Sequence, residues 1–438
     1  MSSVAVDRVH QVLKNYILAD GFDCVFDPIK SLGSYLADAK TGRTFLDLFS
    51  FFATQPIGFN HPKMNTHEFC QHLGRLSLNR PTLSDIYTPE YASFVETFAR
   101  IAGKNYFRYY FFVEGGTLGV ENALKIAFDW KVRKNLAGSR GEKGSQIIHF
   151  KDAFHGRSGY TISMTNTFDP HKHQYFAKFS WPRISNPSLR FPLTDEILKE
   201  VIVKEKLAIS EIKNAIAKNP NDIAALIIEP IQAEGGDNHF RPDFLKELRT
   251  LADENEFLLI FDEVQTGIGL TGKMWAFEHF GVVPDLVAFG KKAQVAGCIS
   301  GIRVDEVKDN VFHVPSRINS TWGGNLTDMI RCQRYLEIIE EENLLLNVTE
   351  VGAYFLRRLS QWAQERERIS NVRGLGLMIA FDLPDTQWRD KMKKEIYKNG
   401  AIMLSCGATS MRIRPHLDFK KENVDQAMEI LIKSEKNL

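Results

Sequence analysis

The stretch DLVAFGKKAQ, residues 285–294, places two adjacent lysines directly after a short apolar run. Four apolar residues, 286–289, stand between an aspartate and a glycine and predict a strand that is buried on both faces, as in a parallel sheet. In α/β sheets, ligands bind where the parallel strands end. We therefore expect Lys291 or Lys292 to meet a ligand at the end of this strand.

Similar apolar runs precede this stretch, and helical patterns separate them. Residues at helical spacing predict one helix from 116 to about 133 and another over 243–254. Strands that alternate with helices indicate an α/β fold with a mainly parallel sheet. The other predicted strands lie at 108–113, 146–150, 223–230 and 257–263.

The two ends of the chain have a different pattern. Residues 33–49 have hairpin character around Thr41-Gly42, and a long helical stretch that begins near Leu326 is interrupted near Asn343. Further strand patterns and a closing helix follow. We predict a large domain over residues 62–327 and a smaller α+β domain formed by residues 1–61 and 328–438.

The composition is that of a soluble globular protein, with 438 residues of which 44% are hydrophobic and 25% charged. A net charge of +1 argues against nucleic acid or an anionic membrane as a partner, and no apolar run is long enough to span a bilayer. The five cysteines form no CxxC pair and the N-terminus has no signal-peptide core, so we expect a cytoplasmic location. We expect no metal site, and we interpret residues 171–173 (HKH) as a solvated polar loop.

The segment after the strand at 257–263 contains two nucleotide-binding patterns. GIGLTG, residues 267–272, fits GxGxxG, and Asp285 lies near the spacing of a ribose-binding residue, but the glycines begin too far beyond the strand for a tight strand-to-helix turn. The same stretch fits GxxxxGK, but Met274 replaces the Ser or Thr that would hold magnesium. An NAD-dependent dehydrogenase is therefore only a rival hypothesis, and a mobile surface loop is an equally good interpretation of these glycines.

Asp262 ends its strand, and its carboxylate is predicted to reach the same edge of the sheet as the lysines. A single aspartate in such a place is most often a helix N-cap. A carboxylate and an amine in one crevice, however, are what pyridoxal phosphate (PLP) requires, because the amine binds its aldehyde and the carboxylate keeps its pyridine nitrogen protonated. Gly115-Gly116-Thr117 opens a helix, where free backbone amides favour a phosphate. Together, the three features predict a PLP site.

These motifs resemble those of the fold-type I, class III pyridoxal-phosphate aminotransferases. The likeness covers nearly the whole chain, and within the family it is greatest to the L-lysine 6-aminotransferases, although 4-aminobutyrate aminotransferases share many features. The resemblance implies a fold-type I transferase with helices flanking the large sheet, PLP as cofactor, and a homodimer with shared active sites. The stretches that carry it are FLLIFDEVQTG, PDLVAFGKK, AFHGRSGYTISMTNT, EPIQAEGG, SRINSTWGGNLTDM and MRIRPHL.

The resemblance also implies a role for each matching residue. Lys291 would be the Schiff-base lysine, an assignment that strand geometry alone leaves open, and Lys292 would be a structural or phosphate-proximal cation. Asp262 would bind the pyridine nitrogen. At Gly115 the chain departs from the serine of many relatives. The other cofactor contacts would be Gly116 and Thr117 at the phosphate, Phe154, Val264 and Gln265 at the ring, and Thr321 at the phosphate of the neighbouring subunit.

Two arginines would bind substrate carboxylates. Arg157 resembles the family arginine for the distal carboxylate, and Arg414 resembles the one for the carboxylate next to the carbonyl. Glu234 would pair with Arg414 and swing away when a keto acid arrives, and Asn319 would contact the α-amino group of the substrate.

The implied reaction moves the terminal amine of L-lysine to 2-oxoglutarate. The products would be L-glutamate and 2-aminoadipate 6-semialdehyde, which cyclises to piperideine-6-carboxylate. The alternatives are 4-aminobutyrate or ornithine as the amino donor, and a regulatory protein that keeps the fold without catalysis.

Overall fold

A computed structural model describes residues 4–438. Its largest sheet is formed by strands from the middle of the sequence. The strands of this sheet are β3 (Tyr109–Val113), β4 (Gln146–Phe150), β5 (Arg183–Ile184), β6 (Ile223–Ile228), β9 (Leu258–Asp262), β10 (Leu286–Phe289) and β11 (Ala296–Ser300). Their order is β3-β11-β10-β9-β6-β4-β5. Strand β11 runs antiparallel to both neighbours, and the other pairs are parallel. The predicted α/β fold with a mainly parallel sheet is confirmed.

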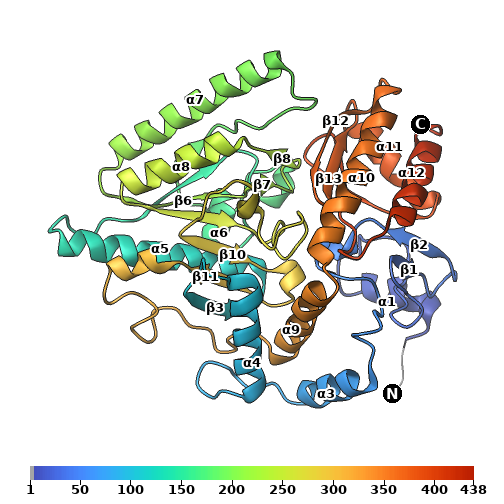
Figure 1. Ribbon diagram of the computed structural model, residues 1–438, viewed down its shortest axis with the longest axis horizontal. Coiled ribbons are helices and arrows are strands. Elements are labelled where there is room, and N and C mark those ends of the chain that lie inside the picture. Colours follow the sequence, from blue (N-terminus) through green and yellow to red (C-terminus); the bar gives the residue numbers. More distant parts are fainter. Residues whose placement is uncertain (1–3) are drawn as a thin grey trace.

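Helices cover both faces of this sheet (Figure 1). Helix α5 (Gly116–Ala137) packs on the face toward which Leu258 and Ile260 of β9 point. Helices α7 (Asp195–Lys218) and α8 (Pro242–Glu254) lie on the other face, with Leu259 and Phe261. Because successive strand residues alternate between two buried faces, the strands are continuous apolar runs. Helix α7 and strand β11 were not among the predicted elements.

A three-stranded sheet brings an N-terminal and a C-terminal segment of the chain together (Figure 1). Strands β1 (Tyr35–Ala37) and β2 (Thr44–Asp47) form the predicted hairpin, and β14 (Ala401–Ile402) pairs with β2. The N-terminal and C-terminal parts of the chain therefore share a sheet, whereas the exact domain limits stay a prediction. The other small sheet has the order β12 (Ser370–Leu375), β13 (Met378–Asp382), β16 (Ser410–Ile413) and β15 (Leu404–Cys406), and β7 (Ile231–Gln232) pairs with β8 (Asn238–His239).

The long helical stretch of the C-terminal part is two helices. Helix α9 (Leu326–Glu341) ends before Asn343, whose φ of 50° breaks the helix, and α10 (Leu344–Gln364) follows, as predicted. No helix within residues 4–438 is long and apolar enough to cross a membrane. The other helices are α1 (Val9–Lys14), α2 (Ser50–Ala53), α3 (His67–Ser77), α4 (Pro89–Phe98), α6 (Gly159–Met164), α11 (Thr386–Lys398) and α12 (Lys421–Glu435).

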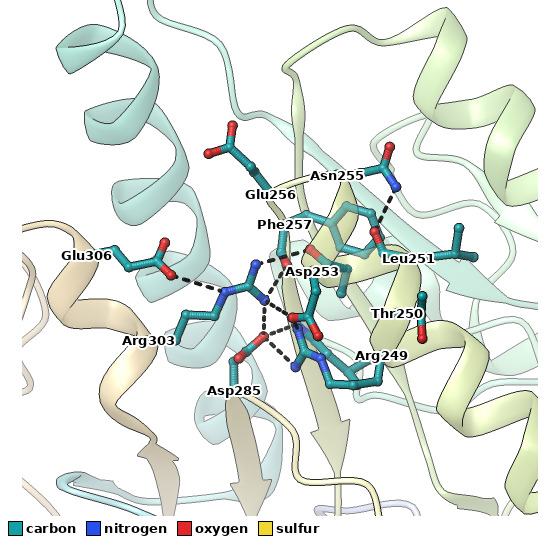
Figure 2. Close-up of polar contacts among 12 residues, drawn as sticks. Arg249, Thr250, Leu251, Asp253, Asn255, Glu256, Phe257, Asp285, Arg303 and Glu306 are labelled. Carbon is teal, nitrogen blue, oxygen red and sulfur yellow. Dashed lines mark hydrogen bonds and ion pairs between the residues drawn. The ribbon is translucent and has the colours of Figure 1, made fainter.

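A cluster of ion pairs around Asp285 fixes the first end of β10 (Figure 2). Oδ2 of Asp285 accepts hydrogen bonds from Arg249 at 2.9 Å, from Arg303 at 3.1 Å and from the backbone N–H of Leu259 at 2.7 Å. Both arginines also bind Asp253. Asp285 thus joins β10 to β9 and α8, and it lies at the end of the strand that is remote from the two lysines.

The glycine-containing loop after β9 is buried, so its interpretation as a mobile surface loop is wrong. Glu263 ties the loop down, because its carboxylate accepts hydrogen bonds from the hydroxyl of Thr266 at 2.7 Å and from the backbone N–H of Ala276 at 2.8 Å. A Cβ on Gly267 would lie 2.6 Å from the ring of Trp275, so this position requires glycine. The loop forms turns and no helix, so neither nucleotide-binding pattern has the context that it needs.

Candidate active site

Strands β9 and β10 end side by side, and their last residues form one wall of the candidate site. Their parallel register pairs Asp262 with Ala288, three residues before Lys291. Lys291 opens the short 3-10 helix η5 (Lys291–Ala293) with a φ of 48°. Such a left-handed conformation costs a non-glycine residue about 1 kcal/mol and is common at functional sites. The carboxylate and the amine thus lie at the same edge of the sheet.

Charges of both signs surround the amine of Lys291. Burial and the positive charge of Arg412 lower its pKa from 10.5 to about 8, while Glu234, Asp262 and Glu229 oppose this shift. An amine with a pKa near 8 is neutral in roughly a tenth of the molecules at pH 7, far more than an ordinary lysine. Neutral amines act as bases and nucleophiles, so this environment suits a reactive lysine.

Lys292 has a different environment and holds the backbone. Its Nζ donates to the carbonyl of Ala53 at 3.0 Å, and burial lowers its pKa well below the ordinary value. Gln294 donates to the neighbouring carbonyl of Thr54 at 2.7 Å. These bonds secure residues 50–53, which all have positive φ and form a left-handed turn. Of the two roles considered for Lys292, the structural one agrees with this contact.

A histidine orients the carboxylate of Asp262. Nδ1 of His155 lies 2.7 Å from Oδ2 of Asp262, and the backbone N–H of Val264 donates to Oδ1 at 3.0 Å. Burial alone would lower the pKa of His155, but the hydrogen bond and the charge of Asp262 outweigh it and raise the pKa. His155 was not among the predicted site residues, although it lies inside the FHGRSG motif.

Glu229 is a second buried carboxylate that was not predicted. It follows β6 as Asp262 ends β9, which is the signal that would have identified it. Its oxygens accept hydrogen bonds from the backbone N–H groups of Phe154 at 2.9 Å and Ala233 at 3.1 Å. Burial raises its pKa to about 7, with the nearby charge of Asp262 acting in the same direction.

The first turn of α5 forms a cradle for an anion. Gly116 is the first helical residue, and a Cβ there would lie 2.7 Å from Cγ1 of Val264, so only glycine fits. The hydroxyl of Thr117 lies 2.9 Å from those of Ser158 and Thr161. Unpaired backbone amides at the start of a 22-residue helix, together with hydroxyls, are the chemistry that binds a phosphate.

These groups fit PLP. Lys291 offers an amine, Asp262 offers a carboxylate held by His155, and Gly116 and Thr117 offer an anion cradle, all at the carboxyl edge of the large sheet.

The other predicted cofactor and substrate residues fall into two groups, one close to His155 in the sequence and one apart from the rest of the site. Phe154 adjoins His155, and the guanidinium of the exposed Arg157 lies 5.9 Å from its ring. Asn319 and Thr321 are exposed and, in the described part of the chain, form no hydrogen bond with another predicted site residue. The single chain therefore does not bring these two residues into contact with the rest.

The two arginines of MRIRPHL pair differently from our prediction. Nη1 of Arg412 lies 2.6 Å from Oε2 of Glu234. The guanidinium of the buried Arg414 pairs instead with Asp237, and its Nε donates to Gln265 at 3.2 Å. The predicted pair of Glu234 and Arg414 is wrong, and Arg412 takes that place. Residues two apart in a strand share a face, so the pattern did not distinguish them.

Glu234 also pairs with Lys172, for which the sequence pattern predicts a solvated loop. The Lys172 side chain is 22% exposed, whereas the His171 side chain is 85% exposed, as expected for a solvated histidine. Burial would raise the pKa of Glu234, but the charges of Arg412 and Lys172 outweigh it and lower the pKa. Glu234 is therefore a carboxylate between two cations.

The chain matches the family Aminotransferase class-III over residues 19–434. It belongs to the class-III aminotransferases. It is 50% identical over 425 residues to an L-lysine-epsilon aminotransferase of Mycobacterium tuberculosis, with 96% of this chain and 94% of the relative covered. It is 45% identical over 429 residues to an L-lysine-epsilon aminotransferase of Streptomyces clavuligerus, with 97% and 93% covered.

A solved structure supports the same assignment. The lysine aminotransferase from M. tuberculosis in the internal aldimine form has a TM-score of 0.97 and 48% identity, and the alignment covers 99% of this chain and 100% of that one. Class-III aminotransferases use PLP, so this aminotransferase is a PLP-dependent, fold-type I transaminase. The predictions of family, fold and cofactor are confirmed, which removes the dehydrogenase hypothesis.

Proposed function

We propose that this aminotransferase moves the ε-amino group of L-lysine to 2-oxoglutarate and forms 2-aminoadipate 6-semialdehyde, which cyclises, and L-glutamate. Two L-lysine-epsilon aminotransferases that are 50% and 45% identical to it over nearly the whole chain support lysine as the donor. The structural observation that carries the proposal is the ion pair of Arg412 and Glu234 beside Lys291.

This ion pair suits a site that binds two unlike substrates in turn. When lysine presents its ε-amine, an apolar chain lies next to the reacting carbon and a free arginine there would be unfavourable. Glu234 neutralises Arg412 in that state. 2-Oxoglutarate instead has a carboxylate beside its carbonyl, and Arg412 can bind this carboxylate once Glu234 moves away. Arg157 would bind the distal carboxylate of either substrate.

The residues around Lys291 would divide the chemical work. When bound, PLP supplies a carbonyl that carries the amino group between the substrates and a ring that accepts electron density from the reacting carbon. Lys291 Nζ would take a proton from the ε-carbon of lysine in the first half of the reaction, and in the second half it would deliver a proton to the α-carbon of the new glutamate. Asp262, oriented by His155, would hold the proton of the ring nitrogen.

The remaining predicted residues would hold the cofactor and the donor. Gly116 and Thr117 would bind the phosphate through the helix N-terminus. Phe154 and Val264 would pack against the two faces of the ring, and Gln265 would donate to its phenolic oxygen. Asn319 would contact the α-amino group of lysine.

We further propose a homodimer in which Thr321 contacts the phosphate bound by the neighbouring subunit. The exposure of large apolar side chains near Thr321 supports this, because Trp322 is 39% and Tyr87 70% exposed in the single chain. The backbone joins these segments, since the N–H of Leu83 donates to the carbonyl of Trp322 at 3.0 Å. Thr321→Ala should weaken PLP binding without changing the dimer mass in sedimentation.

The test of the donor follows the visible absorbance of the bound cofactor. L-Lysine added alone to the holoenzyme should change the cofactor band, and 2-oxoglutarate should then restore it with formation of one L-glutamate per site. The same experiment with 4-aminobutyrate and L-ornithine separates the alternatives. If the band does not change with lysine but changes with one of these amines, that amine is the donor and the enzyme is still a transaminase.

A further inference from the structure

Lys172 is a cation at the substrate end of the site that no part of the proposed reaction uses. It ends the short 3-10 helix η3 (Pro170–Lys172), which Asp169 caps by accepting a hydrogen bond from the backbone N–H of His171 at 3.1 Å. The cap fixes the turn, and the side chain of Lys172 extends from this turn to Glu234. The contact joins residues 62 positions apart in the chain.

The two cations hold different oxygens of Glu234. Lys172 Nζ donates to Oε1, and Arg412 Nη1 lies 2.6 Å from Oε2. Lys172 is on the solvent side, because its side chain is 22% exposed whereas that of Arg412 is 5% exposed. Glu234 can therefore leave Arg412 without losing its bond to Lys172.

A cavity of about 490 Å³ gives Glu234 room for such a movement. The carboxylate lies in its wall together with Lys172, while Arg412 does not line it. The rest of its lining is formed by residues 167–171, by Ser405, Cys406 and Gly407, and by Arg389, whose guanidinium donates to the carbonyls of Gly407 and Ala408 and pairs with Asp390. A shift of the Glu234 side chain into this space moves it toward Lys172 and away from the buried arginine.

When a substrate carboxylate occupies Arg412, Glu234 no longer pairs with this arginine. A partly buried carboxylate that loses its only cation carries a large desolvation cost. With Lys172 in place, the displaced Glu234 keeps a charge-assisted hydrogen bond. We propose that Lys172 is a positioning residue for the keto-acid half of the reaction, which holds Glu234 when the carboxylate next to the carbonyl of the acceptor takes Arg412. This inference rests on the proposed function.

The first test compares the two half-reactions of the holoenzyme. In Lys172→Met, the 2-oxoglutarate concentration that gives half the maximal rate should rise about tenfold, because the displaced Glu234 then has neither Lys172 nor Arg412 as a partner, whereas in the lysine state Arg412 still pairs with it. The corresponding lysine concentration should stay within a factor of about two. Lys172→Arg should restore the acceptor half-reaction, because it keeps a cation with several donors.

Lys178→Met is the matched control. Lys178 belongs to the same loop, is exposed, and forms no ion pair within residues 4–438. It should leave both half-reactions unchanged. An equal effect of Lys178→Met and Lys172→Met would assign the change to the net charge of the loop and overturn the proposal.

A double-mutant cycle separates positioning from direct substrate binding. In Glu234→Gln there is no charge to hold, so adding Lys172→Met should not weaken 2-oxoglutarate further. A persistent tenfold effect in that background would mean that Lys172 binds the substrate itself, which would overturn its role as a positioning residue. Equal weakening of both half-reactions by Lys172→Met would overturn it as well.

Binding of glutarate provides a readout that does not depend on turnover. This dicarboxylate cannot react, and calorimetry should show weaker binding to Lys172→Met than to Lys172→Arg. The proposed function fails separately, when the unmodified holoenzyme does not respond to lysine. A normal lysine response with no acceptor defect in Lys172→Met rejects only the role of Lys172.

Discussion

Strand β10 has charged residues at both ends, and the charges at the two ends differ in their partners. At the first end, Asp285 binds Arg249, Arg303 and the backbone of Leu259 (Figure 2). At the other end, Lys291 pairs with no carboxylate among residues 4–438, and burial and Arg412 act against its charge.

The difference shows how one strand can carry both a structural and a reactive group. Burying a charge is costly unless it is paired, and the cluster around Asp285 meets this cost with two arginines. Lys291 is left without such a partner, which lowers its pKa and keeps the amine available. In this strand the fully paired charge, Asp285, stabilises the fold, and the unpaired charge, Lys291, lies in the candidate site.

Lys291→Ala tests the reactive end and should have the largest effect. Turnover should fall by at least about 10³-fold, because the variant loses both the nucleophile and the base. The melting temperature should not fall, since the substitution removes a buried unpaired amine. Substantial lysine-dependent glutamate formation by this variant would contradict the role of Lys291.

Arg412 in β16 and Arg414 just after this strand extend the comparison to the small sheet. Arg412→Met should raise the KM for 2-oxoglutarate about 100-fold with little change in stability, because it removes a cation from the substrate end. Arg414→Met should instead lower the free energy of unfolding by about 3–5 kcal/mol, since it leaves the buried Asp237 unpaired. Denaturant unfolding and steady-state kinetics of both variants distinguish them, and the reverse result would favour a pair of Glu234 and Arg414.

Asp285→Asn tests the saturated end of β10. The free energy of unfolding should fall by about 2–4 kcal/mol, because the buried Asp285 loses the charge that binds Arg249 and Arg303, whereas kcat of the folded enzyme should not change. Asp253→Asn is the matched control. The Asp253 side chain is 58% exposed, so its loss should cost less than about 1 kcal/mol. A large loss of kcat in Asp285→Asn would show that this end also serves the reaction.

The pKa of Lys291 predicts the smallest effect, on the rate at which PLP binds to the apoprotein. Only the neutral amine reacts with an aldehyde, and its fraction grows as the pH rises until the pH exceeds the pKa. With the pKa lowered to about 8, the rate should rise with pH and level off above about pH 8. An ordinary lysine would give a rate that still rises at about pH 10. The growth of the cofactor band after mixing measures this rate.

Removing Arg412 should shift this profile. Its positive charge lowers the pKa of Lys291, so in Arg412→Met the pKa should rise and the plateau should move to higher pH. Lys178→Met keeps every charge around Lys291 and should leave the profile in place.

The sequence predicted the parts of the site that lie at strand and helix ends. The apolar runs of β9 and β10 identified buried strands, and the rule that parallel strands end at one edge placed Asp262 and one of the two lysines there, while the family resemblance selected Lys291. The glycines before α5 identified a helix start in the same way. These features depend on neighbours in the chain, so a single sequence contains them.

Contacts between distant segments were missed or assigned wrongly. His155 and Asp262 are 107 residues apart, and Lys172 reaches Glu234 from a loop whose pattern is only polar. Arg412 and Arg414 are only two residues apart, and tertiary packing decides which of them meets Glu234. The buried glycine loop also depends on such packing, since Trp275 folds back onto Gly267.

The sequence by itself therefore determined the α/β fold, the edge at which Asp262 and Lys291 meet, and the family through its motifs. Only the tertiary structure decided the partners of each charge, including Arg412 and Lys172 on Glu234 and His155 on Asp262. The physical reason is that strand and helix patterns are set by local periodicity, whereas an ion pair forms wherever folding brings two charges together and removes water around them.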